Sequence, residues 1–141
     1  MVKMIEDGVA YSPLKMPNIN AAVFPDLLYN HTAERTSSTT LNLSITVNLK
    51  MIEVISKKEH KLINGTSRFK FETDQGLTLD DIYIAFKKAF NNVYHALLNF
   101  LLQKGMPKMN IKFDSIENMT DSITPILKMF NETSYVPNNK H

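Results

Sequence analysis

A strict alternation of apolar and polar residues over 41–50 is the clearest pattern in the chain. The apolar positions are Leu41, Leu43, Ile45, Val47 and Leu49. The residues between them are polar, so one face of this segment is suited to burial and the other to water. The pattern therefore predicts a half-buried strand.

The alternation slips after Lys50 and resumes further along. The next apolar residues are Met51, Ile52, Val54 and Ile55, and no single strand face can hold all of them. This slip predicts a bulge or sharp bend. We expect a turn over 56–61 and a return strand to about Thr73, with Gly65 marking a local irregularity. The inward residues of that strand are Ile63, Phe69 and Phe71.

A helical period follows and predicts a cover for this long hairpin, which would be only marginally stable alone. Thr78 and Asp81 have the spacing of a capping box, and Lys104 followed by Gly105 closes the other end. Between these ends runs one wide apolar stripe: Ile82, Phe86, Ala89, Phe90, Val93, Leu97, Phe100 and Leu101. The predicted fold class is α+β, an antiparallel sheet covered on one face by this long amphipathic helix plus a short C-terminal helix.

Three apolar residues of the long helix lie off its stripe, near the polar flank. They are Ile84, Leu98 and Leu102. A helix that is apolar on two sides is covered twice, by its own sheet and by a second surface. That surface is either the N-terminal part of the chain or, alternatively, another subunit or a bound chain.

The N-terminal segment is less regular than the hairpin. Residues 1–36 contain three prolines and are predicted to form an irregular or edge-strand arm that docks on an α+β domain spanning 37–131. Residues 32–40 lose almost all hydrophobicity and are predicted to be a loop. Together these parts make a single domain, as expected for a chain of 141 residues.

Weaker signals describe the C-terminal part. Residues 109–113 alternate and predict a short strand. The last helix is predicted to begin near Thr120 or Thr124, the latter placing a proline at the first helical position. Residues 132–141 are polar and are predicted to form a frayed tail.

Composition narrows the chemistry. The chain has no cysteine, which excludes disulfides, thiolate nucleophiles and cysteine-based metal sites. The four histidines, His31, His60, His95 and His141, are far apart and none has a metal-ligand spacing with another. Asp80 and Asp81 are explained by helix capping. We therefore expect no catalytic residue, no metal and no cofactor, and the chain is not predicted to be an enzyme.

The charge pattern gives no strong indication of a polyanionic partner. The formal net charge is +2, and the main basic cluster consists of Lys57, Lys58, His60 and Lys61 at the expected turn, followed by Arg68 and Lys70. We interpret it as a solvated hairpin tip with lysines guarding strand edges, so no nucleic acid is expected. No secretory signal or membrane span is found in the sequence, and we expect a cytoplasmic location.

The order of elements resembles the SecB-type export chaperones and their SecB-like relatives over residues 38–130. A long bent strand, a return strand and a long helix are followed by Gly105-Met106-Pro107-Lys108-Met109-Asn110-Ile111-Lys112-Phe113. The resemblance implies a holdase that binds unfolded polypeptide without a cofactor, as a tetramer of paired sheets with apolar grooves for clients. The implied client or subunit contacts are Ile84, Leu98, Leu102, Met106 and Met109.

Two departures from that family leave a rival open. Export chaperones of this type tend to be acidic, whereas this chain is slightly basic and ends in Asn138-Asn139-Lys140-His141. The rival is a structural or assembly subunit of a larger particle, for example a phage component. Both hypotheses predict unfolded polypeptide or neighbouring subunits as partners, and a homo-oligomer is expected.

Overall fold

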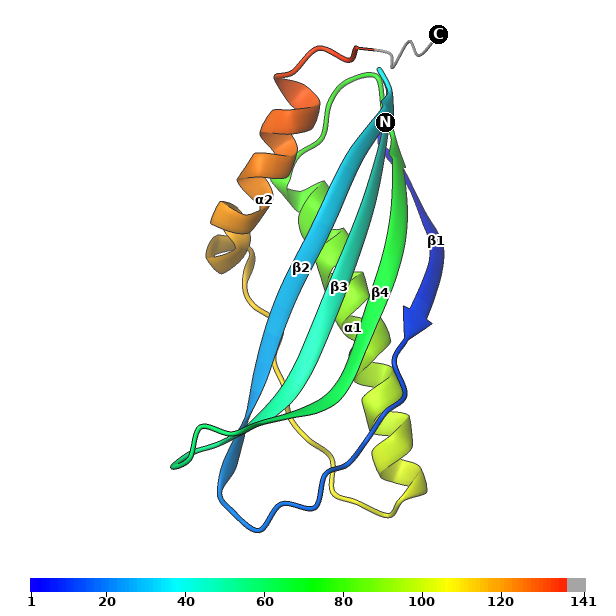
Figure 1. Cartoon of the computed structure of the whole chain (residues 1–141). Coiled ribbons are helices and arrows are strands. Elements are labelled where there is room, and N and C mark those ends of the chain that lie inside the picture. The colour runs from blue at the N-terminus through cyan, green and yellow to red at the C-terminus, as the bar shows by residue number, and fades with distance from the viewer. Residues whose placement is uncertain (137–141) are drawn as a thin grey trace, which may run out of the picture.

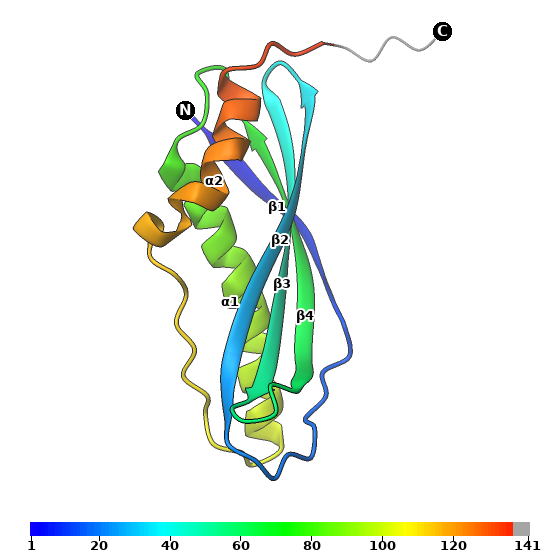
Figure 2. The same ribbon diagram turned by 60° about the vertical axis from the view of Figure 1, so that its left-hand side comes forward.

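The computed structural model describes residues 1–136, which fold into a four-stranded antiparallel sheet with two helices on one face (Figure 1). The elements are β1 (Lys3–Tyr11), β2 (Val23–Ser37), β3 (Thr40–Glu53), β4 (Glu59–Glu72), α1 (Leu79–Gln103) and α2 (Ile116–Asn131). The order across the sheet is β1-β4-β3-β2. Both helices lie on the same side of the sheet (Figure 2). This arrangement confirms the predicted fold class.

The central strands β3 and β4 are those in which the sequence alternates most clearly. Leu41 pairs with Phe71 and Leu49 with Ile63, so the apolar residues of both strands share the face that α1 covers, and all four are buried. The predicted irregularity is present, because the register shifts between Leu49 and Lys50. The extra residue is Leu62, on β4 rather than β3, and it is buried as well. The turn is earlier than the predicted 56–61, since β4 already begins at Glu59.

The predicted arm supplies both outer strands of the sheet. β1 pairs with β4 and β2 pairs with β3, each antiparallel. The predicted loop over 32–40 is wrong, because β2 continues to Ser37 and only residues 38–39 form the turn. Thr32 and Glu34 point to the open face of the sheet, where polar side chains remain in water, so a strand needs little hydrophobicity there.

The long helix α1 begins and ends as predicted. Thr78 accepts a hydrogen bond from the Asp81 amide, and the Asp81 carboxylate accepts one from the Thr78 amide at 2.8 Å, which completes the capping box. At the other end Gly105 has φ +67°, the left-handed conformation that favours glycine. The irregularity predicted at Gly65 is wrong. That residue continues the ladder of β4 opposite Val47 and lies directly under Val93 of α1.

The second helix starts earlier than predicted. Its N-cap is Ser115, whose hydroxyl accepts from the Asn118 amide at 3.3 Å, and Pro125 lies inside the helix. A proline removes one backbone hydrogen bond and favours a kink, yet α2 is continuous to Asn131. Thr124 donates to the carbonyl of Thr120 in the turn before the proline. At the end of α2 the Asn131 side chain exchanges two hydrogen bonds of 2.8 Å with the backbone of Leu77.

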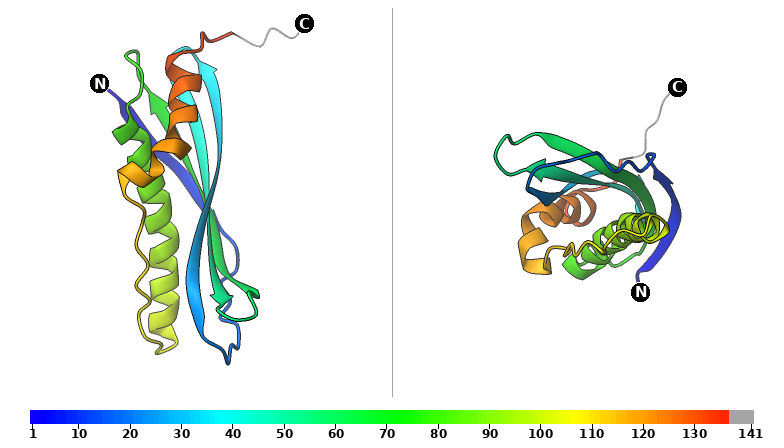
Figure 3. Two further views of the ribbon diagram at one scale, coloured as in Figure 1. Left: turned by 90° about the vertical axis from the view of Figure 1, so that its left-hand side faces the viewer. Right: turned by 90° about the horizontal axis from the view of Figure 1, so that it is seen from below.

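Residues 106–115 run back along α1 in an extended conformation (Figure 3). The predicted strand over 109–113 is wrong, since no ladder forms there. The alternation results instead from packing of one side of the segment, because Met109, Ile111 and Phe113 contact the core. Tyr94 donates to the carbonyl of Met109, and Tyr83 donates to that of Asp114 at 2.9 Å. Side chains therefore hold this segment. The predicted tail lies in part outside the described residues.

Candidate functional site

The outer side of α1, away from the sheet, carries the residues that the sequence singled out. Leu102 is 79% exposed and Ile84 is 46% exposed. Leu98 is half-buried, and Met106 is exposed just beyond the helix. Met109 is half-buried and packs against the core. Apolar side chains are thus presented to solvent on an otherwise well-packed helix.

These residues do not form one continuous surface. Leu98, Leu102 and Met106 are near the C-terminal end of α1, whereas Ile84 is near its start. At about 1.5 Å per residue, Ile84 and Leu102 are about 27 Å apart along the axis. The outer side between them is polar and includes Lys88, Asn91 and His95. Ile84 instead lies near the edge of the sheet, where it lines a shallow pocket with Val2 and Met4 of the N-terminal segment and Phe71 of β4.

The N-terminal part of the chain covers Ile84 only in part and leaves Leu102 largely exposed. Tyr11 donates to the carbonyl of Asn92, whose side chain donates to Ser67 at 3.0 Å and to Glu6 at 3.2 Å. These bonds join β1 to the flank of α1 that faces β4, because Ser67 is fully buried under the helix. The sequence allowed two covers for these residues, the N-terminal part of the chain or another chain. Of these, β1 leaves Ile84 and Leu102 exposed.

A second group of exposed apolar residues was missed by the sequence analysis. It consists of Phe24, Leu28, Val54 and Ile55, on β2 and at the β3–β4 turn. Ile55 is 94% exposed. The open face was expected to be polar, but Phe24 pairs with Ile52 there. The change of pattern after Lys50 could have predicted this surface. Ile52 and Val54 fall at the positions of the alternation that are polar before Lys50, and these positions face away from the helices.

The β3–β4 turn that presents Ile55 is held in one shape by a small polar network. The Glu53 carboxylate accepts from Ser56 Oγ at 2.8 Å and lies 2.6 Å from His60 Nε2. Lys57 donates its amide to the carbonyl of Glu53 and has φ 61°. The hydrogen bonds from His60 and Ser56 lower the pKa of the Glu53 carboxyl below its ordinary value.

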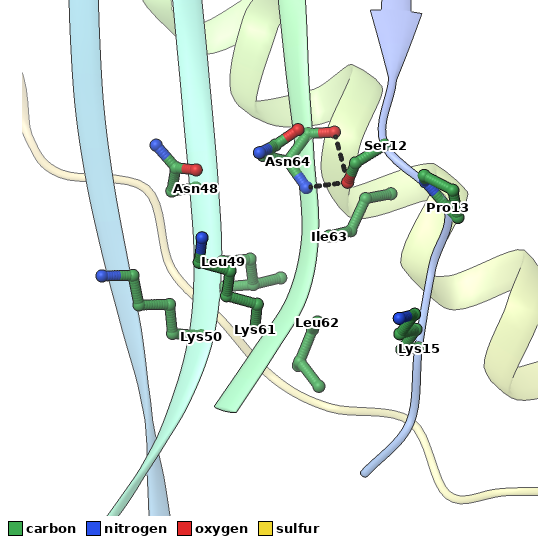
Figure 4. Close-up of a pocket in the computed structure, with 10 residues that line it drawn as sticks. All are labelled: Ser12, Pro13, Lys15, Asn48, Leu49, Lys50, Lys61, Leu62, Ile63 and Asn64. Carbon is green, nitrogen blue, oxygen red and sulfur yellow. Dashed lines mark hydrogen bonds between the residues drawn. The ribbon is translucent and has the colours of Figure 1, made fainter. Parts of the chain in front are cut away.

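A pocket of about 330 Å³ lies at the base of this hairpin (Figure 4). Its lining includes the ammonium-bearing residues Lys15, Lys50 and Lys61 together with amide and apolar side chains. Asn64 donates its amide to Ser12 Oγ at 2.9 Å, which fixes one wall. Lys50 is paired with Glu59 at 3.0 Å. The remaining donors make the pocket suitable for a carboxylate rather than a cation.

Residues 1–136 contain no candidate metal-binding cluster and no candidate membrane-spanning helix. No group of three or more histidine, aspartate or glutamate side chains within that range could hold a metal ion. Within the same range, neither helix is long and apolar enough to cross a membrane.

Comparison with known proteins gives a likeness in fold to solved structures. No family model matches the chain, and no curated protein matches its sequence. A solved structure with a similar fold is the Mycobacterium tuberculosis Rv1957 SecB-like chaperone in complex with a ChAD peptide from Rv1956 HigA1 antitoxin. The identity is 9%, the TM-score is 0.47, and the match covers 82% of this chain and 90% of that one. That protein is a SecB-like chaperone, the class that the sequence pattern of this chain resembles.

Proposed function

We propose that the protein is a non-catalytic, polypeptide-binding holdase, and that the C-terminal end of α1 contacts unfolded clients. The observation that carries the proposal is the exposure of Leu102 on a helix whose other large apolar residues are mostly covered. Covering a leucine side chain stabilises a complex by roughly 1.5–3 kcal/mol. A client that covers Leu102 therefore gains directly from this surface.

The neighbours of Leu102 support a contact with many different sequences. Leu98 lies one turn earlier on the same side, and Met106 follows the helix end. Methionine is flexible and polarisable, so it adapts to side chains of different shape. Lys104 lies over the ring of Phe100 at 5.6 Å, while Leu102 and Met106 beside it are exposed. We infer a surface that selects for apolarity more than for shape.

Suppression of aggregation tests this function. A chemically unfolded model protein is diluted into buffer with and without the chaperone candidate, and light scattering is followed. We expect the wild type to lower the scattering at equimolar amounts, and Leu102→Ser with Met106→Ser to lose most of that effect.

Ile84→Ser is the matched control, because Ile84 is also exposed but lies at the other end of α1. It should retain the activity of the wild type. A wild type that leaves scattering unchanged would contradict the holdase and favour the structural-subunit rival. Equal activity of all three proteins would place the contact elsewhere.

A further inference from the structure

The two ends of the molecule carry opposite charge, although the chain as a whole is close to neutral. We define the hairpin end as the β3–β4 turn, the neighbouring ends of β2, β3 and β4, residues 12–22, and the C-terminal end of α1 with residues 104–108. These parts lie at the same end of the molecule in Figures 1 and 3, with the β3–β4 turn and the end of α1 on opposite sides of it. Its basic residues are Lys15, Lys50, Lys57, Lys58, Lys61, Lys104 and Lys108. Its acidic residues are Asp26, Glu53 and Glu59.

The opposite end has the reverse balance. It holds the β2–β3 turn, the start of α1 and the end of α2 (Figure 2). The acidic residues there are Glu34, Glu72, Asp74, Asp80, Asp81 and Glu132, and the basic ones are Lys3, Arg35, Lys70 and Lys128. The net charge of the whole chain is only +2, yet the hairpin end carries more basic than acidic residues and is positive. Such a field draws in ligands of negative charge.

The acidic groups of the hairpin end are mostly engaged within the protein. Glu59 pairs with Lys50 at 3.0 Å, and Glu53 pairs with His60 at 2.6 Å. Within the part of the chain that the structure describes, the other lysines of this end form no ion pair, and all of them are exposed. Their charges are available to a partner.

The same end also holds much of the exposed apolar surface. Phe24, Val54, Ile55, Leu102 and Met106 all lie there and are exposed. Lysines flank these residues in sequence, since Lys57 and Lys58 follow Ile55, and Lys104 lies between Leu102 and Met106. A surface of this composition complements a chain in which apolar and acidic side chains alternate.

We propose that the hairpin end recognises unfolded polypeptide segments in which acidic residues stand among apolar ones. This proposal rests on the polypeptide binding proposed above and names the class of client. Apolar client residues would cover Leu102 and Ile55, while client carboxylates pair with the exposed lysines and enter the pocket at Lys15 and Lys61. A nucleic acid is a poorer match, because base stacking needs aromatic side chains and Phe24 is the exposed aromatic of this end.

The preference is measured with three labelled peptides that share the same apolar residues. Their remaining positions are all glutamate, all glutamine or all lysine, and affinity is read by fluorescence anisotropy. Each exposed ion pair contributes modestly, so a few pairs together give about tenfold tighter binding of the glutamate peptide than of the glutamine peptide at low salt. The difference should largely vanish at ~0.5 M salt, where exposed charges are screened.

A charge-reversed variant tests the location. Lys57→Glu with Lys58→Glu should lower the affinity for the glutamate peptide about tenfold and leave the glutamine peptide unchanged. Lys87→Glu with Lys88→Glu is the matched control, because it changes the net charge equally on an exposed part of α1 nearer the opposite end. That control should bind as the wild type does.

The outcomes separate the two proposals. Equal binding of all three peptides would overturn the acidic preference while leaving the holdase in place. Binding of none of them would remove the holdase itself. Sedimentation of the wild type with vesicles rich in anionic lipid, without any preference among the peptides, would assign the hairpin end to membranes and also overturn the proposal.

Discussion

Gly65 illustrates how a single residue sets the distance between the sheet and its covering helix. A Cβ at this position would lie 2.7 Å from Cγ2 of Val93 and 3.1 Å from the ring of Tyr11. The sequence suggested an irregular strand because glycine often marks one. The strand is regular, and the glycine is needed for a close approach. Sequence pattern alone does not distinguish these two uses of glycine.

Replacing this glycine should weaken the packing of α1 on β4. We expect Gly65→Ala to lower the free energy of unfolding by about 1–3 kcal/mol, because the added methyl forces the helix or Tyr11 to move. Urea denaturation followed by circular dichroism measures the change. Adding Val93→Ala removes the nearest clashing atom, so the double variant should lose less than the sum of the two single losses. An additive result would show that the methyl is accommodated elsewhere.

At the scale of elements, the sequence predicted the strands and the helix that have one fully buried side. It did not predict the elements whose burial is incomplete. β3, β4 and α1 were recognisable because their apolar residues repeat with the period of a strand or a helix over many positions. β2 was taken as arm and loop, since an edge strand with one face in water carries few apolar residues. The start of α2 was missed because the cap at Ser115 precedes a polar first turn.

Residues 109–113 show a different source of error. Alternation reports that one side of a segment is buried, and a strand is only one way to bury it. Here Met109, Ile111 and Phe113 pack inward, but the amides of residues 108–114 donate to no backbone carbonyl within the described chain. The segment is therefore extended without belonging to the sheet.

Hydrogen exchange should separate this segment from the true strands. We expect the amides of 108–114 to exchange much faster than those of β4, because protection requires a hydrogen bond as well as burial. Mass spectrometry of short peptic fragments resolves the two regions. The matched comparison is the fragment containing Phe69 and Phe71, which have similar alternation and lie in a ladder on both sides. Equal protection of both fragments would mean that the segment pairs with another chain in solution.

At the scale of the whole molecule, the candidate surface was only partly foreseeable. The off-stripe leucines of α1 were visible in the helical period, and Leu102 is indeed exposed. The apolar residues near the β3–β4 turn were interpreted as the sign of a bulge or bend in the strand, not as an exposed surface. That the turn and the end of α1 lie at the same end depends on topology, which local patterns do not carry. The charge separation between the two ends was hidden for the same reason.

The exposed side of α1 also bears on assembly. If a second copy covers Leu98 and Leu102, Leu98→Asp with Leu102→Asp should convert a closed oligomer into a monomer, because a buried carboxylate without a partner is costly. Light scattering coupled to size-exclusion chromatography gives the mass of each protein. Lys87→Glu with Lys88→Glu serves as the control for added negative charge. Equally stable monomers for wild type and variant would exclude a subunit contact on this surface.

The position of β1 in the sheet has a consequence for how the chain is made. β1 precedes β2 in sequence, yet Lys3 pairs with Glu72 at the far side of the two hairpins. Closing so long a loop costs more chain entropy than forming either hairpin, and such distant pairings slow folding. During synthesis β1 is made before the other strands of this sheet, yet it has no partner until β4 has been synthesised. The pairing of β1 with β4 is therefore expected to complete the sheet.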